Sequence, residues 1–312
     1  MRVVIIGGVA GGMSAATRLR RLREDAEIVV FEMGEHVSYA NCGLPYFVSD
    51  VISNRDDLLL QTPTSLWNRF RIEVRVNSKV TKIDRVSKTM SVEDMVTGEI
   101  SESSYDYLVI STGAKPRRLE IPGIERALTL RNVTDADQIK ARFAETENAS
   151  AVILGAGFIG IELAENLSHL GIVTTIVQRG STILSQFDPE MIEPLQARLV
   201  ENGIRLELNS EPIEISATEV LLADGRKLPA QVVVSAAGVA PDNLLAREAG
   251  LTIGKTGGLW VDQQQRTSDP YIFAAGDAVE KLGELTGEQT LIPLANLANR
   301  HGRFMGEFFF DQ

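Results

Sequence analysis

The first 32 residues combine two apolar runs with one amphipathic segment. Arg2 to Ile6 is a short β-branched run, and apolar residues then recur at helical spacing from Met13 to Arg23. A second apolar run starts at Glu27 and closes on the acidic Glu32. This order predicts a strand, a helix and a second strand, with a glycine-rich turn after the first strand.

The same order of patterns returns in the second half of the chain. Ala151 to Leu154 is apolar and leads into a second glycine-rich turn. A helical pattern follows from Ile161 to Leu170, and another apolar run covers Val173 to Val177. We therefore predict two βαβ units of the nucleotide-binding type, which are the only internal repeat that we find.

Shorter patterns fill the rest of the chain. Three alternating runs between the two units predict a small antiparallel meander: Ile72 to Val76, Lys79 to Ile83 and Thr89 to Val92. Later strands are predicted at Arg205 to Leu208, Glu219 to Leu222, Val232 to Ala236 and Tyr271 to Ala275. The last segment, Leu291 to Phe310, is mostly helical in pattern.

Two glycine- and proline-containing breaks mark domain boundaries, at Gly113 to Pro116 and at Gly238 to Pro241. A chain of 312 residues fits about two domains. We predict an α/β protein with two Rossmann-like domains, the second inserted in the first. Residues 1–112 and 241–312 form the first domain, and residues 113–240 form the second.

Charge and hydropathy narrow the range of partners. The chain has 42 acidic and 31 basic residues and a net charge of -11, which disfavours binding to a nucleic-acid backbone. The longest apolar stretch, Ala151 to Ala164, contains Glu162 and is shorter than the roughly 20 residues that cross a bilayer. The N-terminus does not read as a signal peptide. We expect a cytoplasmic protein that binds neither nucleic acid nor membrane.

The two glycine turns predict dinucleotide binding, because such turns bring backbone amides and a helix N-terminus to a pyrophosphate. The second turn has the full spacing, with Gly155, Gly157 and Gly160. The first turn has Val9 at the middle position, where Gly8 and Gly11 are expected to supply the missing room. One such turn is weak evidence, whereas two in matching contexts are much stronger.

The residue expected to contact the ribose differs between the two units. Glu32 lies at the end of the second strand of the first unit, as a ribose-binding carboxylate should. The second unit has Gln178 and Arg179 at this place. Losing the carboxylate and gaining a guanidinium favours the 2′-phosphate of NADPH over NADH, unless Arg179 is merely solvated.

Cys42 is the only cysteine in the sequence, so the chain cannot form an internal disulfide. The open alternatives are a buried inert thiol, a reactive thiol and a thiol that pairs with another molecule. The neighbours Tyr39, Asn41 and Gly43 are poor core formers, and Pro45 suits the first turn of a helix. A thiol at the start of a helix is stabilised as the nucleophilic thiolate.

These motifs resemble the two-dinucleotide flavoprotein disulfide reductases over nearly the whole chain. Tyr105 to Gly113 is similar to the segment that leaves the FAD domain, and Val234 to Gly238 to the segment that returns to it. Thr267 to Asp277 resembles the second FAD motif, whose aspartate binds the ribityl chain.

Within this superfamily, Ser38 to Tyr46 is similar to the branch with one redox cysteine. That branch contains coenzyme A disulfide reductases, persulfide reductases, NADH oxidases and peroxidases. The coenzyme A disulfide or persulfide reductases match best, on Gly7 to Gly12, on Ser38 to Tyr46, and on Pro293 with Ala298 to Arg300.

The resemblance implies FAD on the first unit, NADPH or NADH on the second, and Cys42 as the catalytic residue, with no metal site. The implied cofactor-binding residues are Gly7, Gly8, Val9, Ala10, Gly11, Gly12, Glu32, Ser111, Thr112, Gly113, Gly155, Gly157, Phe158, Ile159, Gly160, Glu162, Gln178, Arg179, Gly238, Gly276, Asp277, Pro293 and Leu294. The implied substrate-binding residues are Ser14, Arg18, Arg21, Ser38, Asn41 and His301.

Several of these residues have a second interpretation. Glu162 resembles a glutamate beside the nicotinamide and flavin rings, or it is a solvated helix residue. Ser14, Arg18 and Arg21 resemble a helix face that meets the pantetheine and phosphates of coenzyme A, or they form a solvated face. His301 is an acid or base near the sulfur, or a structural residue.

The implied reaction passes hydride from NAD(P)H through FAD to Cys42, which reduces a coenzyme A disulfide or a related persulfide. The resting thiol is then expected as a mixed disulfide with coenzyme A or as a sulfenic acid. An NADH oxidase or peroxidase that cycles through the sulfenic acid is the alternative enzyme. A nucleotide-binding module without catalysis is the alternative from another class.

The family normally continues into an interface domain that forms a homodimer. This sequence ends at Phe308, Phe309, Phe310, Asp311 and Gln312. We therefore expect a truncated chain that keeps FAD, turns over weakly alone, and presents its terminal phenylalanines to the absent domain.

Overall fold

The computed structural model describes residues 1–144 and 149–308, and the chain packs into two compact units. Unit 1 consists of Met1–Tyr39, Leu59–Lys115 and Ala240–Gln312, and unit 2 consists of Ala40–Leu58 and Pro116–Val239. The predicted domain boundaries stay predictions. The expectation for the terminal phenylalanines concerns the side chains of Phe308, Phe309 and Phe310, which lie outside the described part of the chain.

Unit 1 is built on a five-stranded sheet whose neighbouring strands are all parallel. Its order is β17 (Ile272–Ala274), β7 (Tyr107–Ile110), β1 (Arg2–Ile6), β2 (Glu27–Phe31) and β3 (Glu73–Arg75). Its helices are α1 (Ala10–Leu22), α3 (Pro63–Phe70), α7 (Leu244–Glu248) and α8 (Ala295–Phe308). Both predicted strands and the predicted helix of the first βαβ unit are confirmed.

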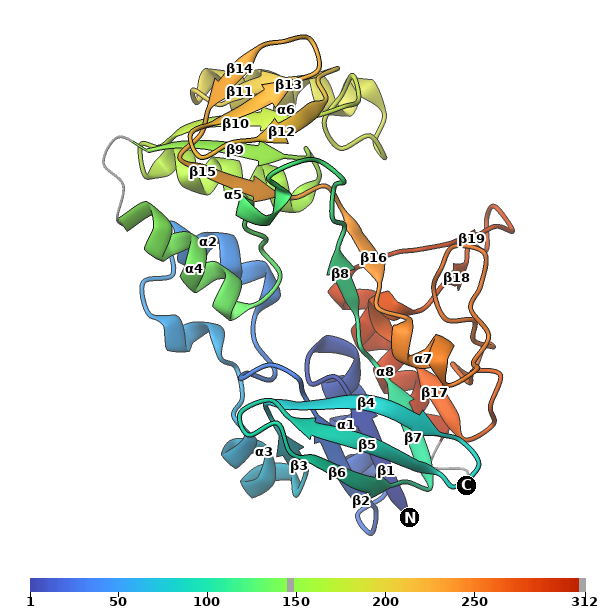
Figure 1. Cartoon of the computed structure of the whole chain (residues 1–312). Coiled ribbons are helices and arrows are strands. Elements are labelled where there is room, and N and C mark those ends of the chain that lie inside the picture. The colour runs from blue at the N-terminus through green and yellow to red at the C-terminus, as the bar shows by residue number, and fades with distance from the viewer. Residues whose placement is uncertain (145–148, 309–312) are drawn as a thin grey trace. The chain divides into compact units, whose positions relative to one another are not determined.

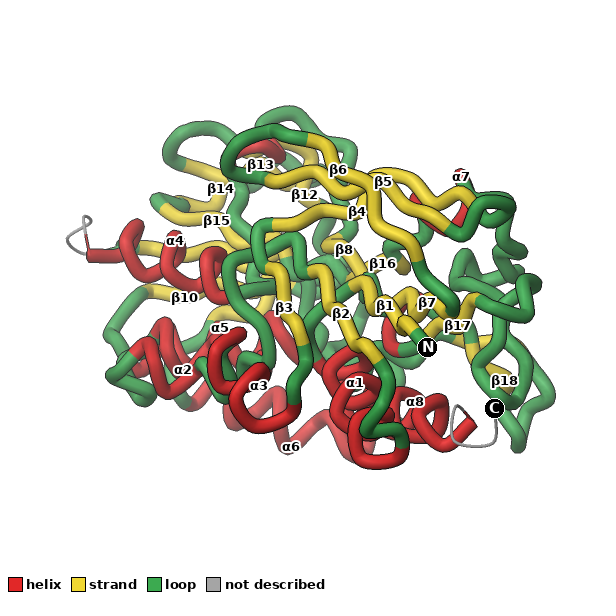
Figure 2. Tube along the Cα trace, turned by 90° about the horizontal axis from the view of Figure 1, so that it is seen from below, coloured by secondary structure: helices red, strands yellow, loops and turns green. Residues whose placement is uncertain are grey.

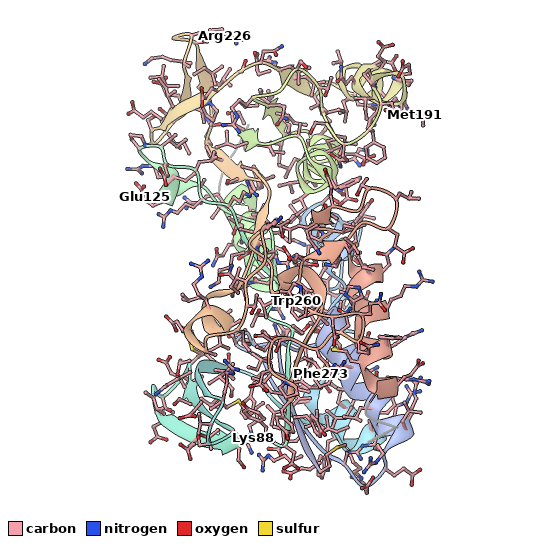
Figure 3. All side chains as sticks on the ribbon, turned by 90° about the vertical axis from the view of Figure 1, so that its right-hand side faces the viewer. Lys88, Glu125, Met191, Arg226, Trp260 and Phe273 are labelled. Atoms are coloured by element: carbon pink, nitrogen blue, oxygen red, sulfur yellow. The ribbon has the colours of Figure 1, made fainter. Side chains whose placement is uncertain are left out.

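Unit 1 has three layers, which Figure 2 shows edge-on. Helices α1 and α8 lie side by side on one face of the parallel sheet, and an antiparallel sheet covers the other face. That antiparallel sheet has the order β4 (Ser78–Asp84), β5 (Thr89–Asp94) and β6 (Ile100–Ser104). Each interface is filled by apolar side chains, and Phe273 of β17 is fully buried within the unit (Figure 3).

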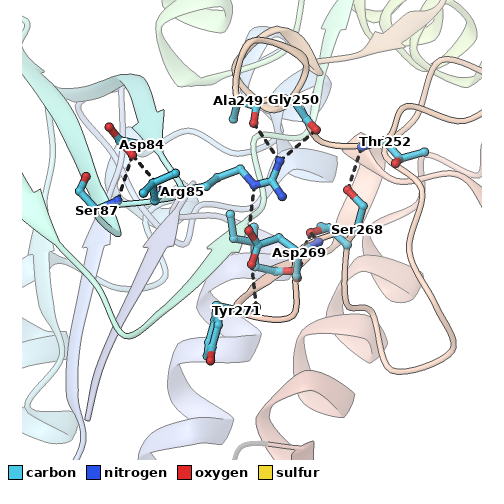
Figure 4. A network of polar contacts seen from close by, with 12 residues as sticks. Asp84, Arg85, Ser87, Ala249, Gly250, Thr252, Ser268, Asp269 and Tyr271 are labelled. Carbon is cyan, nitrogen blue, oxygen red and sulfur yellow. Dashed lines mark hydrogen bonds and ion pairs between the residues drawn. The ribbon is translucent and has the colours of Figure 1, made fainter.

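A polar network fastens the antiparallel sheet to the parallel one (Figure 4). Arg85, in the turn after β4, donates from Nε to Oδ2 of Asp269 at 2.8 Å. Its Nη1 donates to the carbonyl oxygens of Ala249 and Gly250, which follow α7. Asp269 also accepts from the backbone amide of Tyr271 at 3.0 Å, immediately before β17. The network therefore fixes the loop before β17, which is part of the segment that resembles the second FAD motif.

Unit 2 repeats this plan. Its parallel sheet has the order β11 (Arg205–Glu207), β10 (Val173–Val177), β9 (Ser150–Leu154) and β15 (Val232–Ser235), and its antiparallel sheet consists of β12 (Pro212–Ile215), β13 (Glu219–Leu222) and β14 (Lys227–Pro229) (Figure 1). Its helices are α2 (Leu44–Val48), α4 (Val133–Ala144), α5 (Phe158–His169) and α6 (Pro189–Glu201). The internal repeat thus extends beyond the βαβ units and includes an antiparallel sheet.

One prediction of strand pairing was wrong, and one strand of the meander was not predicted. Ile72 to Val76 was expected to begin the meander, but β3 pairs with β2 in the parallel sheet, with Val74 opposite Val30. The third strand of the meander is β6, whose sequence from Ile100 to Ser104 is mostly polar and exposed. A polar edge strand carries no apolar alternation, so the pattern did not reveal it.

The predicted breaks are also ordered. The segments after Gly113 and Gly238 form β8 (Ala114–Pro116) and β16 (Val239–Pro241), which pair with each other. The remaining strands are β18 (Lys281–Leu282) and β19 (Gln289–Thr290). In the part of the chain that the structure describes, no helix combines the length and apolarity needed to cross a membrane.

Candidate active site

The first glycine turn joins β1 to α1, and two of its glycines are required by the backbone itself. Gly7 has φ of 103°, and a Cβ there would lie 2.2 Å from the carbonyl oxygen of Ser111. A Cβ on Gly12 would lie 2.0 Å from the carbonyl oxygen of Gly7. The turn is therefore pressed against β7 and against the first turn of α1. Val9, the N-cap of α1, has no polar side chain, so no side chain caps the first amides of α1.

Side-chain atoms lie close to the positions that a Cβ would take on Gly8 and Gly11. A Cβ on Gly8 would lie 2.7 Å from Cγ1 of Val37, and a Cβ on Gly11 would lie 2.7 Å from Oγ of Ser111. Both glycines are therefore needed for packing around the turn. That they also make room for a ligand stays a prediction.

Glu32 is fixed beside the first turn by two backbone amides. Its Oε2 accepts a hydrogen bond from the amide of Gly8 at 2.7 Å, and its Oε1 accepts one from Gly34 at 2.8 Å. The carboxylate therefore has one orientation next to the turn, which suits hydrogen bonding to ribose hydroxyls.

The other predicted FAD residues of unit 1 follow the ends of neighbouring strands. Ser111 follows β7, and its backbone amide donates a hydrogen bond to the carbonyl oxygen of Ile6 of β1 at 2.8 Å. Gly276 and Asp277 follow β17, where Gly276 has φ of 80°. Because β1, β7 and β17 are parallel neighbours, their carboxyl ends meet at one edge of the sheet, where ligands of such folds bind. Thr112 and Gly113 continue from β7, and Pro293 and Leu294 precede α8.

Together these features fit FAD. The uncapped N-terminus of α1 suits a pyrophosphate, Glu32 suits a ribose, and Asp277 lies at the same sheet edge for a polyol chain.

Sequence reasoning did not identify Lys281, which lies near Asp277. Its Nζ donates to the carbonyl oxygens of Gly276 and Val279, each at 3.0 Å. Burial lowers the pKa of Lys281, and the charge of Asp277 opposes this shift. Lys281 begins the two-residue strand β18, and such a short segment carries no sequence signal, so only the fold reveals its contact with the Gly276 carbonyl.

The second glycine turn, between β9 and α5, uses its glycines in two different ways. A Cβ on Gly155 would lie 2.4 Å from the carbonyl oxygen of Ala236, and one on Gly160 would lie 2.1 Å from that of Gly155. For Gly157, by contrast, no described atom lies within 4 Å of the Cβ position. The fold therefore needs Gly155 and Gly160, whereas the open side of Gly157 is available to a ligand.

Gln178 occupies in unit 2 the place that Glu32 has in unit 1. Its Oε1 accepts a hydrogen bond from the amide of Ala156 at 3.2 Å, as Glu32 accepts from Gly8. Both side chains follow the second strand of their βαβ unit. The neutral amide thus preserves the contact and removes the negative charge. Arg179 follows it and is exposed.

The remaining predicted residues of unit 2 lie on α5 and after β15. Phe158 is half exposed and packs edge-on against Phe187, with ring centroids 6.0 Å apart. Ile159 is partly buried beside it. Burial raises the pKa of Glu162, and the charge of Glu165 adds to the shift. Gly238 has φ of 95°.

Cys42 lies in a 3₁₀ turn, Asn41–Gly43, that runs directly into α2, and Pro45 is in the first turn of that helix. The thiol is exposed, so it is not a buried apolar residue. Its segment, Ala40–Leu58, belongs to unit 2, while Ser38 belongs to unit 1 and has φ of 47°.

The three residues of the predicted substrate-binding helix face, Ser14, Arg18 and Arg21, have different surroundings. Ser14 Oγ donates to Oδ1 of Asn299 at 2.9 Å, and Arg18 forms an ion pair with Glu307 at 2.9 Å. Both contacts join α1 to α8. Ser14 and Arg18 are one helical turn apart, so they lie on the same side of α1, which is the side that contacts α8. Arg21 is exposed. A role for the three in substrate binding stays a prediction.

His301 is partly buried on α8. Burial lowers its pKa to about 4, and the positive charge of Lys281 adds to the shift. Its Nδ1 is buried without a hydrogen-bond partner among the described residues. The imidazole is therefore neutral near pH 7.

The sequence profile described as pyridine nucleotide-disulphide oxidoreductase matches residues 1–302. The chain is 33% identical over 314 residues to an NADH oxidase of Methanocaldococcus jannaschii, covering 98% of this chain and 69% of that protein. It is 29% identical over 306 residues to a coenzyme A disulfide reductase of Staphylococcus epidermidis, covering 98% and 70%.

Two solved structures share the fold closely. The reduced CoADR-RHD of Bacillus anthracis has a TM-score of 0.97 at 40% identity, covering 99% of this chain and 57% of that one. An NAD-dependent persulfide reductase from A. fulgidus has a TM-score of 0.96 at 37% identity, covering 100% and 60%. This chain therefore spans about 70% of the two curated relatives and less than two thirds of the two solved chains.

Proposed function

Because this chain belongs to the pyridine nucleotide-disulphide oxidoreductase family, we propose that Cys42 receives electrons from NAD(P)H through FAD and reduces a coenzyme A disulfide or a related persulfide. Members of this family are oxidoreductases that use FAD and a pyridine nucleotide. The observation that carries the proposal is the exposure of Cys42, the only cysteine in the sequence. Relatives whose names include coenzyme A disulfide reductase and persulfide reductase support the substrate class.

The two units divide the binding of the cofactors. In unit 1 the N-terminus of α1 would hold the FAD pyrophosphate, Glu32 would hold a ribose and Asp277 would hold the ribityl chain. In unit 2 the open side of Gly157 admits the nicotinamide dinucleotide to the N-terminus of α5. When bound, FAD would supply the two-electron chemistry that links NAD(P)H to the reduction of sulfur.

Cys42 carries the sulfur chemistry. Its thiolate attacks one sulfur of the substrate disulfide, which forms a Cys42 mixed disulfide and releases the first thiolate. Two electrons then cleave the mixed disulfide and regenerate the Cys42 thiolate while the second thiol leaves. NAD(P)H, one proton and one disulfide thus give NAD(P)⁺ and two thiols. A lone cysteine suffices because the substrate supplies the second sulfur.

Gln178 and Arg179 select NADPH over NADH in this proposal. Gln178 keeps the turn contact through Oε1 without the charge that would repel a 2′-phosphate, and the exposed Arg179 is available to pair with it.

An NADH oxidase or peroxidase is the second candidate, which the M. jannaschii relative favours. In that case Cys42 is oxidised to a sulfenic acid by peroxide and is returned to the thiolate by two electrons, with water as the product. The exposed thiol is compatible with this cycle as well.

Substitution of Cys42 tests the proposal. In FAD-loaded protein, Cys42→Ser should abolish NADPH-dependent reduction of coenzyme A disulfide while NADPH still bleaches the yellow flavin absorbance. Unchanged disulfide reduction in this variant would remove Cys42 from the mechanism. Loss of both signals would instead point to failed cofactor binding.

A further inference from the structure

Asn166 is a fully buried polar residue on α5, with 1% of its surface exposed. Most of the buried positions of this helix are apolar or glycine, such as Ile161, Leu163 and Leu167. A buried amide is costly unless its hydrogen bonds are satisfied, so its partners explain its presence.

The partners of Asn166 link two segments of unit 2. Its Nδ2 donates to the carbonyl oxygen of Glu162, one turn earlier on α5, at 2.8 Å. Its Oδ1 accepts from Oγ of Ser49, 117 residues away in the sequence, at 2.5 Å. A carbonyl oxygen accepts only, so the contact with Glu162 fixes which end of the amide faces Ser49.

Ser49 ends the short helix that follows the thiol. The 3₁₀ turn that contains Cys42 runs directly into α2, and Ser49 is the C-cap of α2 and is 7% exposed. The other polar links of this segment within unit 2 are more exposed. They include Lys140 with Asp50 and Arg55 with Asp137. The bond between Ser49 and Asn166 is thus a buried link from the thiol segment to α5.

The Ser49 hydroxyl has two acceptors and only one proton. It donates to Oδ1 of Asn166 at 2.5 Å, and the carbonyl oxygen of Tyr46, within α2, lies at 3.1 Å. The hydroxyl can therefore donate to α5 or back into α2, and the shorter contact is the one to α5. A shift of α5 relative to α2 changes the balance between these two acceptors.

The other end of α5 is the second glycine turn, whose N-cap is Gly157. We propose that Asn166 is a positioning residue that couples occupation of the second glycine turn to the reactivity of Cys42, through Ser49 and α2. Ligand contacts at the N-terminus of α5 shift this rigid helix, and Asn166 passes the shift to the Ser49 hydroxyl. The proposal rests on the proposed function, since it needs a nucleotide at the turn and a reactive Cys42.

The test measures the alkylation rate of Cys42 in the full chain with FAD bound. Iodoacetamide labelling is followed by mass spectrometry with and without saturating NADP⁺, which binds without delivering hydride. In the unsubstituted protein the two rates should differ by about fivefold or more, the lower range of coupling between sites. In Asn166→Leu, and in the milder Ser49→Ala, the ratio should fall to about one while NADP⁺ still binds by calorimetry.

Ser168→Ala is the matched control, because Ser168 lies on the same helix and donates to the carbonyl oxygen of Asn202 instead. It should keep the ratio of the unsubstituted protein. If Asn166 only stabilises the fold, Asn166→Leu and Ser49→Ala will change both rates by the same factor and preserve the ratio, which overturns the coupling. A ratio of one in the unsubstituted protein with NADP⁺ bound overturns it too.

Failure of the proposed function gives a different result. Absence of NADP⁺ binding by calorimetry, or a Cys42 that does not alkylate, would overturn that function and the coupling with it. Binding and alkylation without a change in ratio overturn the coupling alone.

Discussion

The middle positions of the two glycine turns carry different residues, Val9 in unit 1 and Gly157 in unit 2. In unit 2, Gly157 has an ordinary φ of -82° and no described atom within 4 Å of a Cβ position, so the fold does not require glycine there. Gly160 has the opposite character, because backbone atoms fill the space that its side chain would need. In unit 1, Val9 holds the middle position as the N-cap of α1. The nucleotide proposed to bind at this turn is a reason for glycine at a position where the fold does not require it.

Gly157→Ala should therefore separate binding from stability. We expect the midpoint of thermal unfolding to stay within about 1 °C, because surface changes without clashes are nearly neutral. The dissociation constant for NADPH should rise about tenfold, as a methyl group displaces the pyrophosphate. Gly160→Ala is the control, expected to destabilise the fold by about 2 kcal/mol. Titration calorimetry and denaturant unfolding of both variants measure the two effects. Unchanged NADPH binding in Gly157→Ala would contradict the role of this turn.

Gln178→Glu should change the choice of nucleotide. The new carboxylate can keep the hydrogen bond from the Ala156 amide, as Glu32 does in the first unit, but it repels a 2′-phosphate. The ratio of kcat/KM for NADPH to that for NADH should fall about tenfold or more. Steady-state kinetics with both nucleotides measure the ratio. A ratio that does not move would show that this position does not contact the ribose.

At the scale of elements, the sequence predicted what local patterns specify. Both βαβ units follow from apolar runs around glycine turns, and the structure confirms their strands and helices. The pairing of β3 and the existence of β6 were missed, because an alternating run suits either sheet and a polar edge strand has no apolar face. The contact between α1 and α8 joins residues far apart in the sequence, such as Ser14 and Asn299, which are 285 positions apart, so no local pattern indicates it.

Helix α8 packs on α1 through a stripe of small residues. A Cβ on Gly302 would lie 2.3 Å from the carbonyl oxygen of Gly11, and one on Gly306 would lie 2.7 Å from Cγ of Arg18. Gly302→Val should force the helices apart and lower the free energy of unfolding by about 3 kcal/mol, the upper end of the usual cost of overpacking, because the clash is with backbone atoms. Arg303→Ala, at an exposed position of the same helix, should change it by less than about 0.5 kcal/mol. Urea unfolding measures both, and equal stabilities would contradict the close packing.

At the scale of the whole molecule, the chain repeats one plan twice. Each unit places a parallel sheet and its glycine turn together with a three-stranded antiparallel sheet. The sequence predicted this doubling but not that Ala40–Leu58 packs within unit 2. That placement depends on contacts such as Ser49 with Asn166 and Arg55 with Asp137, which are 117 and 82 residues apart. The thiol and the second glycine turn therefore belong to one compact unit.

The central claim is that the lone thiol of Cys42 borrows its disulfide partner from the substrate. The most direct measurement is the mass of the Cys42 peptide from FAD-loaded protein incubated with coenzyme A disulfide, before and after treatment with a reductant. The account predicts the added mass of coenzyme A on Cys42, and release of free coenzyme A on reduction. A Cys42 peptide without that adduct, or one that carries only the oxygen of a sulfenic acid, would contradict the account and support the oxidase or peroxidase cycle.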